Sequence, residues 1–392
     1  MENFIYYTPT KIFFGRHQEE KIASIIRSYG FKRILFHYGQ SSLKKMGLYD
    51  KIVENLTKEG ICFFELGGVE PNPKLSLVEE GIKLVKQENI DFILAVGGGS
   101  VIDSAKAIAV GAKVDFSPWK FSIKEEIPTD HIPVGVVLTL AASGSDMSDS
   151  CVITNDRTLE KRGFNSEQNR PLFAVLNPEL TYSVTPYQTA CGIVDILMHT
   201  LERYFSKGEE TPLTDAIALG LMKTVLNAGK TAYAHPKDYN ARATLMWANS
   251  LSHNGLTSCG RNFVMSVHQI EHEISGMYDH ISHGAGLAVL WPAWAKLAYP
   301  AAKMRFLRFA YEVMNVEKSD QEDQDILEGI RRLKAYFKAI GMPTSMKELE
   351  IPEEKFREIA TNYSFKGQRI LQDIIPVDEE KALEILYQTN QE

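Results

Sequence analysis

Short runs of apolar residues alternate with helix-like stretches through the first half of the chain. Apolar, β-branched and aromatic residues dominate six runs, at 33–38, 61–66, 91–96, 132–140, 151–154 and 172–177. Between them, apolar residues near 47–58 and 75–87 recur with the 3.6-residue period of an amphipathic helix. Near-continuous apolar strands separated by helices predict a parallel sheet with helices on both faces.

The pattern changes near residues 178–185. Beyond this point the strand signals disappear, and apolar residues recur almost wholly with helical spacing. Thr185, Pro186 and Gln188 suit the N-cap, the first helical position and the capping box of a helix. We therefore predict an α/β domain over residues 1–182 and an all-helical domain over residues 183–392.

The opening segment, residues 4–15, is aromatic and is interrupted by Pro9. Proline cannot donate to a strand ladder, so this segment predicts an edge hairpin or arm rather than core sheet. An exposed strand edge can pair with a second copy of the chain, and we expect a homodimer.

Composition limits the classes of function. With 392 residues the chain is too long for one ordinary core, which agrees with two domains. Its net charge of -7 argues against sequence-independent binding of nucleic acid, which needs a cationic surface. The sequence shows neither a signal-peptide pattern nor a membrane-spanning run, and its four cysteines lack Cys-x-x-Cys spacing. We expect a cytoplasmic protein without a membrane partner.

Histidines gather in a way that suggests a metal site. Four of the ten lie between residues 268 and 283, and His199 follows Asp195 by four residues. Residues four apart share a helix face, so Asp195 with His199, and likewise His268 with His272, can reach one divalent ion. A buried Asp–His hydrogen bond or a solvated face would explain one such pair. Two pairs together with His283 favour metal binding.

A glycine-rich turn follows the run at 91–96. Three glycines precede Ser100, which we predict as the N-cap of the next helix. Glycines let the backbone approach a ligand, and a helix N-terminus offers free N–H groups to phosphate. The turn is neither of the two common phosphate-binding patterns, because Ile102 stands where G-x-G-x-x-G ends and no G-K-[ST] follows. A tight connection without a ligand is the alternative.

Four segments, in order along the chain, resemble the iron-containing (group III) alcohol dehydrogenases. They are GGGSVIDSAKA from Gly97, LTLAASGSD from Leu138, the pair Asp195/His199, and HQIEH followed by His283-Gly284. The second resembles the family's T-x-P-A-T-G-S-E segment, with Ala141, Ser143 and Asp146 in place of Pro, Thr and Glu. The chain is most similar to the branch of butanol dehydrogenases and NADPH-linked aldehyde reductases, over essentially its whole length.

The resemblance implies a dehydroquinate synthase-like fold, with a dinucleotide domain, a helical domain and an active site in the cleft between them. It implies metal ligation by Asp195, His199, His268 and His283. Iron is favoured, and Zn(II), Co(II) or Mn(II) would suit the same donors. His272 matches a non-ligand histidine near the substrate, as a catalytic proton carrier or as a group that orients a ligand. His280 is an alternative to His283, which the His-Gly match favours.

The same resemblance assigns cofactor contacts. It assigns binding of the pyrophosphate to Gly97, Gly98, Gly99 and Ser100. It assigns contacts on the nicotinamide side to Asp103, Thr139, Ser143 and Lys161. Lys106 either holds the glycine-rich helix or faces solvent. Where NAD-preferring relatives carry an acidic residue after the first strand, this chain has the neutral residues Gly39, Gln40, Ser41 and Ser42. A carboxylate there would repel a 2′-phosphate, so its absence favours NADP(H), with NAD(H) possible.

Together with the resemblance, these features predict a metal-dependent alcohol dehydrogenase or aldehyde reductase that moves hydride to or from NAD(P)H. The resemblance implies a small, butanal-like aldehyde or primary alcohol as the substrate. One alternative is a zinc peptidase, because residues 268–272 fit the H-x-x-E-H pattern, although Asp195 and the glycine turn would then have no role. Another keeps the fold and changes the substrate, as in glycerol dehydrogenase-like enzymes. A non-catalytic helical scaffold would explain none of the histidines.

Overall fold

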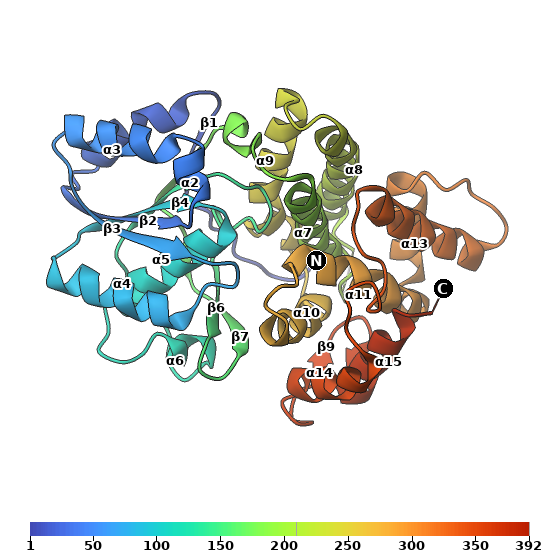
Figure 1. Ribbon diagram of the computed structural model, residues 1–392. Helices are drawn as coiled ribbons and strands as arrows, with labels where there is room; N and C mark the ends of the chain where they lie inside the picture. The colour runs from blue at the N-terminus through green and yellow to red at the C-terminus, as the bar shows by residue number, and fades with distance from the viewer. Residues whose placement is uncertain (209, 392) are drawn as a thin grey trace. The chain divides into compact units, whose positions relative to one another are not determined.

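The chain divides into two compact units in the computed structural model, which describes residues 1–208 and 210–391 (Figure 1). The sheet unit contains Tyr7–Val184 and Pro236–Ser250, and the helical unit contains Met1–Tyr6, Thr185–His235 and Leu251–Glu392. The domain limits 1–182 and 183–392 stay a prediction, from which two segments depart, Met1–Tyr6 and Pro236–Ser250. Pro236–Ser250 clusters with the sheet unit because helix α9 (Tyr239–His253) packs Met246 into the core of that unit.

Six parallel strands form the centre of the sheet unit, in the order β1-β8-β5-β4-β2-β3. The parallel sheet expected from the apolar runs is therefore confirmed. Its strands are β1 (Lys11–Phe14), β2 (Arg33–Gly39), β3 (Cys62–Val69), β4 (Phe92–Gly97), β5 (Val134–Leu138) and β8 (Phe173–Leu176). The helices of this unit, besides α9, are α1 (Ile22–Ser28), α2 (Ser42–Lys45), α3 (Leu48–Lys58), α4 (Leu75–Gln87), α5 (Gly99–Gly111) and α6 (Trp119–Ser122).

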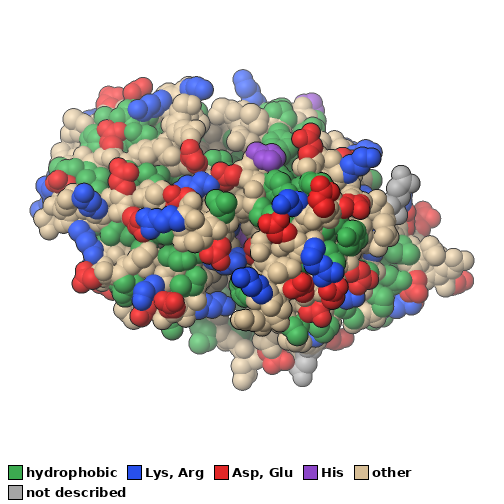
Figure 2. Space-filling model, turned by 60° about the horizontal axis from the view of Figure 1, so that its bottom comes forward, with side chains coloured by type: hydrophobic (Ala, Val, Ile, Leu, Met, Phe, Trp, Pro, Cys, Tyr) green, Lys and Arg blue, Asp and Glu red, His purple; other side chains and the backbone are tan. Residues whose placement is uncertain are grey.

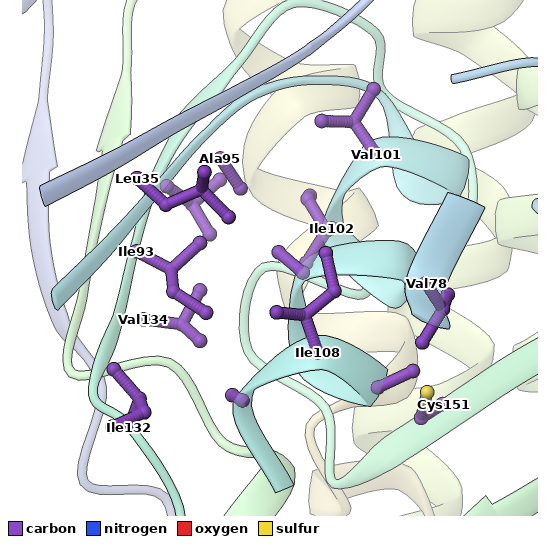
Figure 3. Packing of buried hydrophobic residues seen from close by; sticks show 14 of the residues in the cluster. Leu35, Val78, Ile93, Ala95, Val101, Ile102, Ile108, Ile132, Val134 and Cys151 are labelled. Atoms are coloured by element: carbon purple, nitrogen blue, oxygen red, sulfur yellow. The ribbon is translucent and has the colours of Figure 1, made fainter. Parts of the chain in front are cut away.

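Neighbouring residues of each strand serve opposite faces of the sheet. Leu35, Ile93 and their counterparts on β5 pack against α4 and α5, where Ile102 and Ile108 point back at them (Figure 3). Ile34 and the strand residues that point to the same side of the sheet as Ile34 pack against α1 and α3 on the other face. Burial on both faces explains why these strands read as continuous apolar runs. Parallel strands also bring their carboxyl ends, including the glycine-rich turn, to one edge.

Three local expectations were wrong. The run at 151–154 is β6 (Ser150–Asn155), which pairs with β7 (Glu160–Asn165) in a separate antiparallel hairpin. The opening segment lies at the sheet edge as expected, but it forms no hairpin and it joins the central sheet, because β1 pairs in parallel with β8. Helix α5 begins at Gly99 with Gly98 in the capping position, so Ser100 is inside the helix and is not its N-cap.

Helices make up most of the helical unit, as the 3.6-residue spacing predicted. Besides the end of α9, they are α7 (Pro186–Tyr204), α8 (Pro212–Ala234), α10 (Ser266–Met277), α11 (His283–Ala298), α12 (Lys303–Arg308), α13 (Glu322–Ala339), α14 (Phe356–Tyr363) and α15 (Glu379–Gln388). Two short antiparallel strands, β9 (Leu371–Gln372) and β10 (Pro376–Val377), are the exception. Helix α11 is apolar on nearly every side and lies buried against α7, α10 and α13.

Surface features agree with the composition. Basic and acidic side chains are interspersed over the face shown in Figure 2, as expected for a chain with only a moderate negative charge. Among the described residues, each helix is too short or too polar to cross a membrane. All four cysteines are free thiols.

Candidate active site

Helix α7 places Asp195 and His199 side by side. Its start is fixed as predicted, because Thr185 Oγ1 accepts the backbone N–H of Gln188 at 3.2 Å. Asp195 lies ten residues after Thr185. The four-residue spacing from Asp195 to His199 brings His199 Nδ1 to 3.5 Å from Asp195 Oδ1. Both side chains are buried on a mostly apolar helix, where a carboxylate needs compensation by a cation or by donors.

Two further histidines approach the same carboxylate oxygen. Nε2 of His268, on α10, lies 3.8 Å from Asp195 Oδ1, and Nε2 of His283, at the start of α11, lies 3.9 Å from it. The facing atoms of Asp195, His199 and His268 are within 4.8 Å of one another. The four side chains that the sequence singled out as ligands are thus brought together by three helices.

The orphaned atoms of this cluster fit a metal ion. Asp195 Oδ1, His199 Nδ1 and His268 Nε2 are buried and make no hydrogen bond to any described residue. Buried polar atoms are rarely left without partners, and one divalent ion would satisfy all three at once. One carboxylate oxygen with imidazole nitrogens suits Fe(II), Zn(II), Co(II) or Mn(II).

Two buried glutamates hold the imidazoles from behind. His268 Nδ1 hydrogen-bonds to Glu202, and His283 Nδ1 hydrogen-bonds to Glu271. Glu202 also accepts the backbone N–H groups of Val267, at 2.8 Å, and of His268, at 3.3 Å, so it caps the start of α10. A ring that donates from Nδ1 keeps its lone pair on Nε2, the nitrogen that faces Asp195.

The surroundings of the cluster shift the pKa values of His199 and His268 in opposite directions. Burial lowers the pKa of His199 well below its usual range. Burial alone would also lower the pKa of His268, but Glu202 and Asp195 raise it to about 9. A proton and a cation therefore compete for Nε2 of His268, because a metal ligand must be deprotonated.

Glycine explains why His283 can reach α7. A Cβ atom on Gly284 would lie 2.3 Å from the carbonyl oxygen of Cys191, so only glycine allows α11 to pack this closely against α7. A Cβ atom on Gly286 would lie 2.7 Å from Cγ of Glu271. The two glycines thus make room for α11, which carries His283, and for Glu271 behind it.

Three other histidines, His272, His280 and His253, differ in their positions relative to the cluster. His272 is buried on α10, and its ring centre lies 5.4 Å from that of His283. His280 is exposed and lies edge-on to Tyr278, so the structure brings His283 rather than His280 to Asp195. His253, at the end of α9, has its ring centre 4.0 Å from that of His199, a contact that sequence reasoning did not identify.

In the sheet unit, the glycine-rich turn is packed tightly. A Cβ atom on Gly97 would lie 2.4 Å from the side chain of Val101, and one on Gly99 would lie 2.2 Å from Oγ of Ser143. The N–H of Thr139 donates to the carbonyl oxygen of Gly97 at 3.0 Å. Thr139 and Ser143, predicted on the nicotinamide side, therefore lie directly against the turn.

Asp103 and Lys106 tie α5 to the following loops. Asp103 accepts hydrogen bonds from Ser145 Oγ, at 2.5 Å, and from the N–H of Val152, at 3.0 Å. Lys106 is fully buried, and its Nζ donates to Ser145 Oγ and to the carbonyl oxygen of Ser150, both at 2.8 Å. Burial lowers the pKa of Lys106. Of the two roles considered for Lys106, the structure shows the holding role.

The remaining residues predicted to bind the cofactor lie around the ends of β2 and β7. Gly39 ends β2 and pairs with Val69 at the end of β3, and Ser41 and Ser42 begin α2. Nε2 of Gln40 donates to Glu70 at 3.3 Å, which brings a carboxylate next to the neutral segment. Lys44 lies over the ring of Tyr49, 4.7 Å from its centre. Lys161, on β7, is buried.

Comparison with known proteins decides the family. The family model "Iron-containing alcohol dehydrogenase" matches residues 9–178, and "Fe-containing alcohol dehydrogenase family, C-terminal" matches residues 189–389. The chain belongs to the iron-containing alcohol dehydrogenases. The resemblance seen in its four segments is confirmed.

Members of this family similar to the chain come from several bacteria. A probable NADH-dependent butanol dehydrogenase 1 of Bacillus subtilis is 40% identical, covering 94% of this chain and 95% of the relative. The NADPH-dependent aldehyde reductase YqhD of Escherichia coli is 34% identical over 89% of each chain. The crystal structure of NADH-dependent butanol dehydrogenase A from Thermotoga maritima superimposes with a TM-score of 0.95, at 38% identity and 99% coverage of both chains.

Membership confirms the predicted fold class and type of enzyme. The chain is a metal-dependent oxidoreductase of the alcohol dehydrogenase and aldehyde reductase type that uses a nicotinamide cofactor. The zinc-peptidase alternative is not favoured. Sequence reasoning missed the glutamates behind the ligands, although a helical signal existed: Glu202 lies three residues after His199 and seven after Asp195, on the same face of α7.

Proposed function

We propose that this enzyme reduces short-chain aldehydes to primary alcohols, at a divalent metal held by Asp195, His199, His268 and His283. The observation that carries the proposal is the convergence of three buried, unpartnered ligand atoms on one point, in a member of a metal-dependent dehydrogenase family. Iron is the metal we expect, from the family. Butanal-like substrates are suggested by the relatives named butanol dehydrogenase.

Each group has a distinct task in this proposal. When bound, the ion supplies Lewis acidity toward a carbonyl oxygen, and the reduced nicotinamide supplies hydride. The glycine-rich turn, with the N-terminus of α5, holds the pyrophosphate through backbone N–H groups. His272, which is buried with its ring centre 5.4 Å from that of His283, is the residue we propose to hold or pass the proton that the product alcohol oxygen needs.

The decisive test is metal analysis of purified protein combined with oxidation of NADPH and NADH across a panel of aldehydes. We expect close to one divalent ion per chain and faster aldehyde reduction than alcohol oxidation near neutral pH. Hydrolysis of peptides without a need for nicotinamide would overturn the proposal.

For the cofactor, we propose a preference for NADP(H), with NAD(H) as the second choice. The support is the neutral end of β2, where a carboxylate would bind ribose hydroxyls and repel a 2′-phosphate. The comparison has to be made directly, because the relatives include both NADH- and NADPH-dependent enzymes and because Glu70 lies 3.3 Å from the Gln40 amide.

Gln40→Asp tests this proposal. The variant should weaken NADPH more than NADH by about 1–3 kcal/mol, the range for a like-charge contact in a partly desolvated site. Gln40→Asn is the matched control, because it keeps the site neutral. Steady-state kinetics with both cofactors decide the matter. An unchanged ratio of the kcat/KM values for NADPH and NADH in Gln40→Asp would place the 2′-phosphate elsewhere.

We also propose a cytoplasmic homodimer. Free thiols at all four cysteines support a reducing compartment. The edge position of β1 supports pairing between copies, because its outer hydrogen-bonding groups face no strand of the described sheet. Sedimentation equilibrium should give twice the mass of the chain, and a purely monomeric result would contradict the dimer.

A further inference from the structure

The loop between β5 and β6, residues 139–149, lies against the proposed cofactor turn. Thr139 donates its N–H to Gly97, and Ser143 Oγ occupies the space where a side chain on Gly99 would have to lie. Any change in the backbone of this loop would therefore change the shape of the turn. What fixes the loop backbone also fixes the turn.

One tie comes from a distant part of the sequence. Asn249 on α9 is fully buried, and its Oδ1 accepts the N–H groups of Ala142 and Gly144, both at 2.8 Å. Its Nδ2 donates to Oδ1 of Asp146 at 2.8 Å. One side chain thus binds three points within five residues of loop.

Asp146, the loop residue that Asn249 binds, has a hydrogen-bond partner at each of its two carboxylate oxygens. Asp146 is buried with no exposed surface, and its other oxygen, Oδ2, accepts a hydrogen bond from Ser250 Oγ at 2.5 Å. With Asn249 and Ser250 both bonded to Asp146, α9 holds the loop at its carboxylate and at two backbone amides. Ser145 ties the same loop to α5 through Asp103 and Lys106.

The loop has a particular need for such a tie. Gly144 has a φ of +63°, a left-handed conformation that glycine adopts without penalty but that does not restrain its neighbours. Ala141 adds no ring to fix φ, as a proline at that position would. Charge-free amide acceptors such as Asn249 Oδ1 can satisfy two backbone donors at once.

We infer that Asn249 is a positioning residue for the nicotinamide cofactor. It acts through the loop and the glycine-rich turn, to which its hydrogen bonds to Ala142, Gly144 and Asp146 lead. The inference rests on the proposed cofactor role of the turn. It assigns to α9, a helix beyond the predicted dinucleotide domain, the task of presetting the cofactor site.

The test compares Asn249→Ala with Asn155→Ala in the full-length, metal-loaded enzyme. Asn155 is the matched control: it is a buried amide of the same unit that accepts a backbone N–H, that of Arg157 at 3.1 Å, in the turn between β6 and β7. Dissociation constants for NADPH come from fluorescence titration. Melting temperature, bound metal, and the KM values for NADPH and aldehyde are measured alongside.

We expect Asn249→Ala to raise the Kd and the KM for NADPH about 5- to 30-fold, the range for loss of a buried hydrogen-bonded group that orders a site. Bound metal and the KM for aldehyde should stay within about twofold of wild type on the same reasoning. Asn155→Ala should lower the melting temperature and leave the Kd unchanged. If Asn249→Ala does not fold, Asn249→Ser carries the same expectation with a smaller cavity.

Two results would overturn the inference: a Kd for NADPH that is unchanged in the Asn249 variant, or an equal rise in Asn155→Ala, which would indicate general loosening of the unit. Failure of the proposed function looks different, because the wild-type enzyme would then bind neither NADPH nor NADH.

Discussion

Glu202 offers the sharpest test of how the metal site is built. Its carboxylate accepts the Nδ1–H of His268 and caps α10 through two backbone N–H groups. Replacing it removes a buried negative charge that faces a proposed ligand from behind. The perturbation leaves all four proposed ligand side chains in the sequence, so any loss of metal reports on positioning and charge.

Two effects oppose each other when Glu202 is removed. Together with Asp195, the carboxylate raises the pKa of His268 to about 9, so Glu202 strengthens binding of the competing proton as well as binding of the ion. The ion carries two positive charges and the proton one. At roughly 6 Å and an effective dielectric near 20, each unit of charge is worth about 3 kcal/mol. The ion therefore gains more from Glu202 than the proton does.

Removing Glu202 should therefore weaken the free energy of metal binding by about 1.5–3 kcal/mol, or roughly 10- to 100-fold in affinity. This is the usual effect of removing a group that orients a metal-binding histidine. Glu202→Gln keeps a hydrogen-bond acceptor but not the charge, and we expect its metal affinity to fall about 10-fold. Glu202→Ala loses both and should reach the upper end of the range.

The assay is competition between protein and a chelator for Zn(II) or Co(II), at fixed pH, with circular dichroism to confirm folding. Asp373→Asn is the control, because Asp373 is a buried acid that hydrogen-bonds Ser266 at the start of the same helix without contacting a ligand imidazole in any described interaction. If folded Glu202→Ala binds metal as tightly as wild type, the argument from charge is refuted.

Further outcomes follow from the same site and from the core of the sheet unit. Asp195→Ala and His268→Ala should each lose most bound metal and nearly all turnover while keeping their helical content, because each removes a proposed ligand; stoichiometric metal with wild-type turnover would show that the ligands are elsewhere. His272→Ala should keep its metal, turn over more slowly and show an altered pH profile, whereas loss of metal would make His272 a ligand. Burial lowers the pKa of His37 to about 4, so its stabilising effect is complete above the unfolded pKa of 6.5 and is lost as the pH falls through 4. Chemical denaturation should show about 2 kcal/mol less stability from this group at pH 5 than at pH 7, and His37→Gln should flatten that dependence; an equal slope in the variant would mean that another group titrates.

How far the sequence predicts this protein depends on the range of the interaction. The four-residue spacing of Asp195 and His199 follows from helix geometry, and the parallel sheet follows from apolar runs, so both were accessible. The capping of α7 by Thr185 was also local and is confirmed. Ser100 is not the cap that the sequence predicts, because glycines, which have no side chain to signal their conformation, let α5 begin two residues earlier.

Contacts between distant segments were beyond reach. Glu271 reaches His283 twelve residues away, and Asn249 meets Asp146 across 103 residues of chain. Nothing in the local pattern marks either residue, since a glutamate or an asparagine on a helix is more often solvated than buried. Such pairings depend on which helices pack together, and that is settled by tertiary structure.

The division of the chain has a consequence for how this protein can be dissected. The chain changes unit after Tyr6, after Val184, after His235 and after Ser250, so neither unit is one continuous stretch of gene. A fragment that stops at residue 184 would contain every strand of the central sheet but would lack Asn249 and Ser250, which both donate to the Asp146 carboxylate. We expect such a fragment to need residues 236–250, supplied as a separate peptide or by circular permutation, before it folds. In this enzyme neither half of the sequence corresponds to one complete structural unit.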